Sequence, residues 1–306
     1  MPTASTTSLP EIKEAAALVE DAMVDRDAIT HAPRPGLAFW RLTDVRPALP
    51  AIYHPSFCIV LQGAKCAHLH GAPQVYDPGH YLLSTITLPV ESEVLAASAA
   101  RPLLGLVIEL DFTCLGRLLV ELGDAELPHA GPPSALRINP IDVSFARTLL
   151  RFLRVAQSDV AWQLLADGLR RELHYHVLAG SNGHIVRDRV ERNGKMAQVA
   201  RAIRFVEDHY DQPLGVDAIA RHAGMSASVL HARFKETTGQ SPMQFVKKLR
   251  LHRASALLVA GASVTQAAYA VGYGSASQFS REYKRLFQTP PSAARAAAAT
   301  PTSVSA

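Results

Sequence analysis

Arginine and glutamine side chains stand at helical spacing near the C-terminal end of the chain. Arg281 follows Gln278 by three positions, and Arg285 follows Arg281 by four, so all three share one face if the segment is helical. Arginine can donate two hydrogen bonds to guanine O6 and N7, and glutamine can pair with adenine N6 and N7 in the same way. This spacing therefore allows the side chains to read base edges in a DNA groove.

The segment that carries these side chains is the second copy of a repeat. Residues 226–235 (SASVLHARFK) return 49 positions later as residues 275–284 (SASQFSREYK). Each copy follows a short apolar segment that ends in glycine, at Gly224 and at Gly272, and each precedes a proline. A helix, a glycine turn and a serine-capped helix form the helix-turn-helix arrangement, which places its second helix in a DNA groove.

Apolar residues predict which face of each second helix is buried. Leu230 and Phe234 stand four positions apart in the first copy, as do Phe279 and Tyr283 in the second, so these pairs face inward. The opposite faces supply the predicted DNA contacts, which are Ser228, His231, Ala232 and Lys235 in the first copy and Ser277, Gln278, Arg281 and Arg285 in the second.

A long helix is predicted between the two copies, over residues 242–259, with Pro242 at its start, where a missing N–H costs nothing. Such a helix can hold the copies apart so that they enter successive turns of one DNA face, about 34 Å from each other. Four basic residues on it could contact the phosphate backbone or be ordinary solvated charges: Lys247, Lys248, Arg250 and Arg253.

Positive charge collects in the same third of the chain. Residues 195–295 hold 14 Lys and Arg against 6 Asp and Glu, a net +8, whereas the rest of the chain holds 17 against 21, a net −4. A basic surface attracts the phosphate backbone through counterion release. Together with the repeat, this charge makes double-stranded DNA the expected partner, and a helical interaction bundle that binds no DNA is the alternative.

The C-terminal residues also resemble a known family. Residues 270–275 (AVGYGS) and 279–285 (FSREYKR), followed by Pro290-Pro291, are similar to the signature of AraC/XylS-type transcription regulators. The resemblance covers about residues 196–295. It departs at Gln288, where the family usually has glycine, and at Ala294-Arg295, where it usually has an aromatic residue before the arginine. The resemblance implies RNA polymerase as a partner. It also implies base contacts at six of the positions predicted above, which are Ser228, His231, Ala232, Ser277, Gln278 and Arg281.

The N-terminal half has a different residue pattern. Short β-favouring runs alternate with Gly and Pro over residues 37–110, which predicts a compact barrel or sandwich. Residues 57–65, 76–82 and 88–90 resemble the cupin-like N-terminal domain of one branch of the same regulators. That resemblance implies a domain that senses a signal or mediates dimerisation. A small barrel can also hold one small ligand, so a small-molecule effector is an expected partner.

The expected fold class is α+β, with an N-terminal cupin-like β-barrel that carries a helical hairpin and a C-terminal all-α domain with two helix-turn-helix motifs. The predicted divisions are a sensor domain at 1–180, a linker at 181–195, a DNA-binding domain at 196–295 and a disordered tail at 296–306.

Helical patterns at residues 11–26, 112–122, 142–157 and 160–178 accompany the barrel. The last two could pair in a homodimer, or cover their own barrel. The sequence shows neither a secretory signal nor a run of 18 apolar residues, so we expect a cytoplasmic protein without a membrane partner.

Five residues are candidates for an effector site: Lys65, Cys66, His68, His70 and His80. His68 and His70 point the same way on a strand, and His80 could approach from a neighbouring strand. Metal-binding cupins add a carboxylate soon after such a pair, but Gly71-Ala72-Pro73-Gln74 follows here, so we expect neither a metal nor another cofactor. Lys65 could lower the thiol pKa of Cys66, which would suit a sensor of oxidants or aldehydes, although a filler thiol is the alternative.

Residue patterns for catalysis do not stand out. The sequence shows no Ser/His/Asp constellation, phosphate-cradling glycine loop or paired catalytic carboxylates, so we expect a regulator and not an enzyme. Two alternatives stay open. One is a metal-dependent cupin enzyme fused to a DNA-binding domain, and the other is a constitutive DNA-binding protein whose N-terminal domain only dimerises.

Overall fold

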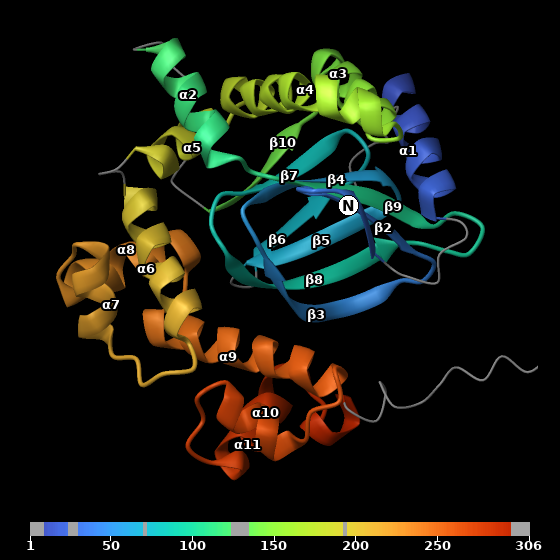
Figure 1. Cartoon of the computed structure of the whole chain (residues 1–306). Helices are drawn as coiled ribbons and strands as arrows, with labels where there is room; N and C mark the ends of the chain where they lie inside the picture. The colour runs from blue at the N-terminus through green and yellow to red at the C-terminus, as the bar shows by residue number, and fades with distance from the viewer. Residues whose placement is uncertain (1–8, 24–29, 70–71, 124–134, 192–194, 295–306) are drawn as a thin grey trace, which may run out of the picture. The chain divides into compact units, whose positions relative to one another are not determined.

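The computed structural model describes residues 9–23, 30–69, 72–123, 135–191 and 195–294. The chain divides into two compact units: residues up to 197, apart from 49–52, form the first, and residues 198 onward, with 49–52, form the second. The first unit contains the sheets, apart from residues 49–52 of the third strand, and the rest of the second unit is helical (Figure 1). The predicted tail at 296–306 and one candidate residue, His70, lie outside the described residues.

Two antiparallel sheets form the N-terminal unit (Figure 1). The first sheet has the strand order β1-β2-β9-β4-β7-β10 and the second has the order β3-β8-β5-β6. The strands are β1 (Thr30–Arg34), β2 (Leu37–Leu42), β3 (Arg46–Tyr53), β4 (Ser56–Gln62), β5 (Ala64–Leu69), β6 (Ala72–Tyr76), β7 (His80–Ser84), β8 (Leu88–Ala96), β9 (Leu103–Glu109) and β10 (Leu136–Pro140). The expected β-barrel is therefore found as two sheets, and the described strands do not close into one ring.

The chain crosses between the sheets at a glycine. β4 of the first sheet ends at Gln62, β5 of the second begins at Ala64, and Gly63 between them has φ +84°. A Cβ at this position would lie 2.4 Å from the carbonyl oxygen of Ala96. Glycine is needed here both for the left-handed backbone and for the close approach of the neighbouring strand.

A central strand, β4, explains how the unit is layered. Its run Phe-Cys-Ile-Val-Leu is buried on both faces, as expected for a strand between two layers rather than at a surface. Phe57 and Ile59 face the helices, whereas Cys58 faces the second sheet, where its Sγ lies 3.8 Å from the hydroxyl of Tyr76. Side chains that alternate along β4 therefore pack against the helices on one face of the first sheet and against the second sheet on the other face.

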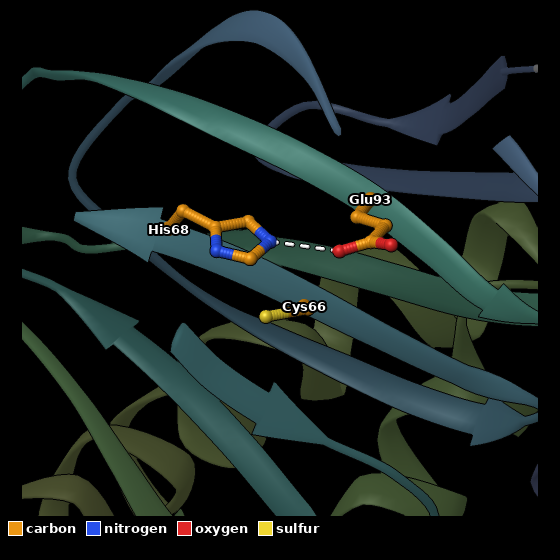
Figure 2. A group of neighbouring side chains, drawn as sticks. All are labelled: Cys66, His68 and Glu93. Atoms are coloured by element: carbon orange, nitrogen blue, oxygen red, sulfur yellow. Dashed lines mark hydrogen bonds and ion pairs between the residues drawn. The ribbon is translucent and has the colours of Figure 1, made fainter. Parts of the chain in front are cut away.

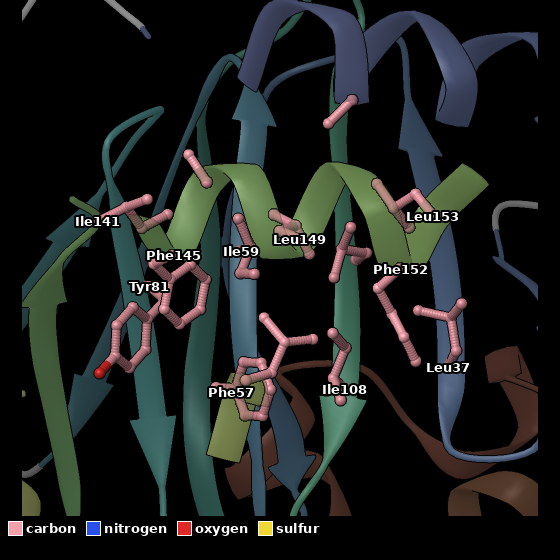
Figure 3. Close-up of a cluster of buried hydrophobic side chains, with 14 of the residues drawn as sticks. Leu37, Phe57, Ile59, Tyr81, Ile108, Ile141, Phe145, Leu149, Phe152 and Leu153 are labelled. Carbon is pink, nitrogen blue, oxygen red and sulfur yellow. The ribbon is translucent and has the colours of Figure 1, made fainter. Parts of the chain in front are cut away.

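Helices cover the first sheet on the face away from the second. Three of them lie on this sheet, α1 (Pro10–Met23), α3 (Val143–Val155) and α4 (Asp159–Ala179), whereas α2 (Phe112–Leu122) and α5 (Gly183–Val190) pack against α4 and against each other. α3 contributes Phe145, Leu149 and Phe152 to the core against β4, β7 and β9 (Figure 3). Phe145 stacks on Tyr81 of β7 with ring centroids 5.1 Å apart. The four predicted helices are found to within a few residues, although residues 24–26 of the first lie outside the described part of the chain. α5 lies in the segment 181–195 that we predicted as a linker.

The described part of the second unit includes the helices α6 (Lys195–His209, which begins in the first unit), α7 (Val216–Ala223), α8 (Ala227–Thr238), α9 (Pro242–Val259), α10 (Val264–Ala270) and α11 (Ala276–Phe287). Gly224 ends α7 with φ +69°, and Gly272 follows α10 with φ +83°. Ser226 and Ser275 then cap α8 and α11 by accepting backbone N–H bonds. We call α7 with α8 the first helix pair and α10 with α11 the second helix pair.

Gln288 ends α11 with φ +59°, the left-handed conformation that glycine adopts most easily. This is the position where the sequence departs from the family's usual glycine. Its side-chain Nε2 donates a hydrogen bond of 3.0 Å to the carbonyl of Arg285. The helix therefore ends in the expected geometry, but on a residue that is strained there.

Candidate functional site

The outward face of α8 carries the predicted contacts of the first helix pair. Leu230 and Phe234 are fully buried, and Phe234 meets Phe245 of α9 edge to face, with ring centroids 5.4 Å apart. This anchoring turns the four predicted residues outward, and all four are exposed: Ser228, His231, Ala232 and Lys235. The predicted orientation of α8 is confirmed, and contact with DNA remains a prediction.

The outward face of α11 has the same construction. Phe279 and Tyr283 are buried, and the hydroxyl of Tyr283 donates a 3.1 Å hydrogen bond to Ser255 of α9. The four predicted residues on the other face are exposed: Ser277, Gln278, Arg281 and Arg285. Because both α8 and α11 are anchored on α9, the two polar faces are held by one common helix.

Glu282 organises the polar face of α11, a role that the sequence analysis missed. Its carboxylate accepts a 2.8 Å bond from the Tyr273 hydroxyl and a 3.4 Å bond from Gln278 Nε2, and it lies 3.0 Å from Lys247 Nζ. Burial alone would raise the pKa of Glu282, but these three partners hold it below its ordinary value. The ionised carboxylate therefore orients Gln278 and occupies Lys247, one of the four predicted phosphate contacts.

Arg250 also has a structural role. Its guanidinium donates to three backbone carbonyls: Nε to Tyr210 at 2.6 Å, Nη1 to Gly272 at 3.0 Å and Nη2 to Gln212 at 2.7 Å. These bonds tie α9 to the chain after α6 and to the turn of the second helix pair. With its donors engaged in this way, Arg250 is held inside the unit, which argues against the predicted phosphate contact.

The two neighbouring candidates on β5, Lys65 and Cys66, point in opposite directions, as successive strand residues must. Lys65 Nζ lies 4.8 Å from the ring of Trp40 and 5.7 Å from that of Tyr53, on the side of the first sheet. Cys66 is buried with 2% of its surface exposed. Burial raises the pKa of the Cys66 thiol, so the expectation that Lys65 lowers it is wrong.

The positive charge of Lys65 acts instead on Cys58, across the space between the sheets. Burial raises the pKa of the Cys58 thiol, and the charge of Lys65 offsets part of that rise. The Tyr53 hydroxyl lies 3.3 Å from the Tyr76 hydroxyl and 3.0 Å from Ser92 Oγ. A cation, two phenols and a thiol therefore meet in the interior of the N-terminal unit.

His68 lies on the outward face of β5 and is paired with a carboxylate that the sequence analysis did not identify. Its Nε2 lies 2.8 Å from Glu93 Oε2 of β8, and one ligand atom each of Cys66, His68 and Glu93 lie within 4.8 Å of one another (Figure 2). His80 stands on β7 of the first sheet, with Nδ1 2.8 Å from Asp77 Oδ1. The predicted approach of His80 to His68 is therefore wrong.

Comparisons with known proteins agree with the two units. The family described as "AraC-type transcriptional regulator N-terminus" matches residues 33–185, and one described as "Helix-turn-helix domain" matches residues 219–297. The HTH-type transcriptional activator RhaS of Enterobacter sp. (strain 638) is 28% identical over 161 residues, which are 52% of this chain and 56% of that protein. RhaS of Escherichia coli O139:H28 is 34% identical over 90 residues, or 32% of its length. The chain thus spans between about a third and just over half of the length of these curated relatives.

Solved structures show a similar fold. ToxT from Vibrio cholerae superimposes with a TM-score of 0.57 over 87% of this chain and 97% of that chain, at 11% identity. ToxT with a bound unsaturated fatty acid gives a TM-score of 0.56 over 83% of this chain. At this level of identity the likeness concerns the fold alone.

Proposed function

The chain belongs to the family of AraC-type transcription regulators and is a DNA-binding regulator; we propose that it reads specific duplex sequence through the exposed faces of α8 and α11. The observation that carries this proposal is that both helices present polar side chains outward while two large apolar residues on each fix that orientation. Phosphate contacts position such a protein, and side chains that reach base edges give it specificity.

We infer that the two helix pairs act as two helix-turn-helix motifs on one support. α9 has 18 residues, which gives it a length of about 27 Å. Both α8 and α11 contact it through buried aromatic rings. A spacer of this length suits two recognition helices that enter successive turns of one DNA face.

The two faces are chemically unequal. On α11, Arg281 and Gln278 offer the side chains that pair best with guanine and adenine, and Glu282 orients Gln278. On α8, Ser228 and His231 offer fewer strong base contacts. We therefore assign most of the base discrimination to α11 and a smaller contribution to α8.

A small-molecule effector in the N-terminal unit is the second part of the proposal. Lys65 lies beside two aromatic rings in the interior, where a cation can pair with an acidic group of a ligand. ToxT, which shares this fold, is described with a bound unsaturated fatty acid. Of the four predicted effector residues that the structure describes, Lys65 is the one that lies beside these rings.

Dimerisation is supported by a groove on α3 and α4. It is lined by Arg151, Arg154, Leu164, Leu165 and Glu172 among others, and Leu164 is 76% exposed. Apolar side chains beside paired charges suit a self-complementary contact with a second copy. RhaS carries the name of a transcriptional activator. We propose that this chain also activates transcription, and that it does so by contact with RNA polymerase.

Both matching families describe regulators or DNA-binding domains, so we propose regulation and not catalysis as the function, carried out in the cytoplasm. Across the described parts of the chain, no helix combines the length and apolar character that crossing a bilayer requires.

The test of DNA reading uses full-length protein and a genomic fragment that it occupies in cells. Arg281→Ala should weaken binding to that fragment by about 1–3 kcal/mol and relax base preference at one position. Arg101→Ala is the matched control, because it removes the same charge from an exposed position of the N-terminal unit. An equal loss for Arg281→Ala on random DNA would show that Arg281 contacts phosphate only.

A further inference from the structure

Cys66, His68 and Glu93 form a cluster of three different metal-ligating groups in the N-terminal unit, away from the exposed faces of α8 and α11 in the sequence (Figure 2). We propose that these side chains bind one divalent transition-metal ion of the zinc class on the outward face of the second sheet, with a coordination position left open to solvent. The proposal is independent of the proposed function, because it concerns a different unit and different residues.

The strand register builds the cluster. Cys66 of β5 stands directly opposite Glu93 of β8, and His68 follows Cys66 by two residues. Residues directly opposite each other in a sheet, and residues two apart in a strand, project from the same face. Lys65, one residue along, projects toward the first sheet, so the cluster faces the other way. Its geometry is therefore fixed by backbone pairing and not by a flexible loop.

The donor set selects the metal class. A thiolate, an imidazole and a carboxylate are the three ligand types that proteins use for Zn²⁺, whereas Mg²⁺ and Ca²⁺ prefer oxygen alone. Three protein ligands with a free fourth position are typical of zinc sites that accept water or an outside ligand. The side chains of His68 and Glu93 are 22% and 31% exposed, so an incoming group can reach the open position.

The ligand atoms must move slightly closer together to bind one metal ion. In a tetrahedral site with bonds of about 2.0–2.3 Å, ligand atoms lie roughly 3.3–3.8 Å apart, and the three atoms here lie within 4.8 Å of one another. Rotation of the partly exposed side chains of His68 and Glu93 covers that difference. The ion would replace the proton between His68 Nε2 and Glu93 Oε2, which are 2.8 Å apart. That proton would move to Nδ1 of His68, so that the neutral imidazole binds the metal through Nε2.

Metal binding at the thiol of Cys66 would release a proton. Cys66 stands opposite Glu93 in the strand register, and the form of cysteine that binds metal is the thiolate. Metal binding forms the bond from sulfur to metal and releases the thiol proton to solvent. Glu91 stands opposite His68 on the same face and adds negative charge beside the ion.

Cobalt substitution tests the proposal on full-length protein. Chelator-treated protein titrated with Co²⁺ should reach one equivalent, with a thiolate-to-cobalt charge-transfer band and visible d–d bands that Zn²⁺ abolishes. Cys66→Ser should remove the charge-transfer band. His68→Gln and Glu93→Gln should each weaken Co²⁺ binding by more than ~100-fold, which exceeds the effect of an outer-shell residue.

Matched controls keep the result clear. Cys114→Ser and His80→Gln change a half-buried cysteine and a carboxylate-paired histidine outside the cluster, and both should keep full metal binding. Far-UV circular dichroism verifies that each variant is folded, and Glu93→Gln, which preserves side-chain size, serves if Cys66→Ser does not fold. Substoichiometric binding, no charge-transfer band, or a band that disappears only in Cys114→Ser would overturn the site.

Discussion

Replacement of Arg250 by methionine should destabilise the helical unit selectively. The guanidinium donates three bonds to backbone carbonyls, two of them part-buried, to Tyr210 and Gly272, and one exposed, to Gln212. A hydrogen bond from a charged donor contributes about 1.5–3 kcal/mol, and an exposed one contributes little because water replaces it. Counting only the two part-buried bonds at the lower value gives a loss of about 3 kcal/mol in the free energy of unfolding.

Two optical probes can assign this loss to one unit. Both tryptophans, Trp40 and Trp162, belong to the N-terminal unit, whereas far-UV circular dichroism also follows the helices of the second unit. In urea, the circular dichroism transition of Arg250→Met should gain an earlier phase, moved by roughly 1.5 M for a slope of about 2 kcal/mol per M. The tryptophan fluorescence transition should not move.

Arg253→Met is the control for the loss of charge on α9. Its guanidinium is exposed and lies 5.8 Å from the ring of Tyr210, a contact that contributes about 0.5–1 kcal/mol. If Arg250→Met costs less than about 1 kcal/mol, water satisfies the carbonyls equally well. The inference that Arg250 holds the second helix pair in place would then be refuted.

Three further substitutions test other features of the chain. Gln288→Gly should stabilise the helical unit by about 1 kcal/mol in urea melts followed by circular dichroism, since it relieves the left-handed strain at φ +59°; unchanged or lower stability would contradict this. Gly63→Ala should lower the tryptophan fluorescence midpoint by at least ~1 M urea, because its Cβ would lie 2.4 Å from the Ala96 oxygen; a wild-type midpoint would show that the sheets can separate there. Burial, aided by the charge of Lys248, lowers the pKa of His252 to about 4. The unfolded chain therefore binds this proton first, and stability present above pH 6.5 should fall by about 2 kcal/mol at pH 4.5. This loss should be absent in His252→Gln, and an equal acid sensitivity in that variant would exclude His252 as its source.

Features set by local sequence were predicted well. The spacing of Leu230 with Phe234, and of Phe279 with Tyr283, depends only on helical periodicity, and the structure places both pairs in the core. The serine caps and the glycine turns also follow from neighbouring residues. The exposed faces of α8 and α11 were therefore predictable without knowledge of the fold.

Features set by long-range pairing were not predictable. Glu93 meets Cys66 and His68 because β8 pairs with β5 in one register, and the sequence does not specify which strands pair. The same reason explains why Lys65 acts on Cys58 instead of its neighbour Cys66. The division of the strands into two sheets likewise depends on strand pairing. The partners of Glu282 were partly accessible, since Gln278 precedes it by one helical turn.

Selection of duplexes from a randomised pool at about 150 mM salt tests the central claim most directly. Full-length protein should enrich one sequence with two conserved blocks whose centres are about 10–10.5 base pairs apart. The pool selected by Arg281→Ala should lose preference at one position of the block read by α11 and keep the other block. Enrichment of no sequence by the wild-type protein, or an unchanged pattern with Arg281→Ala, would contradict the account.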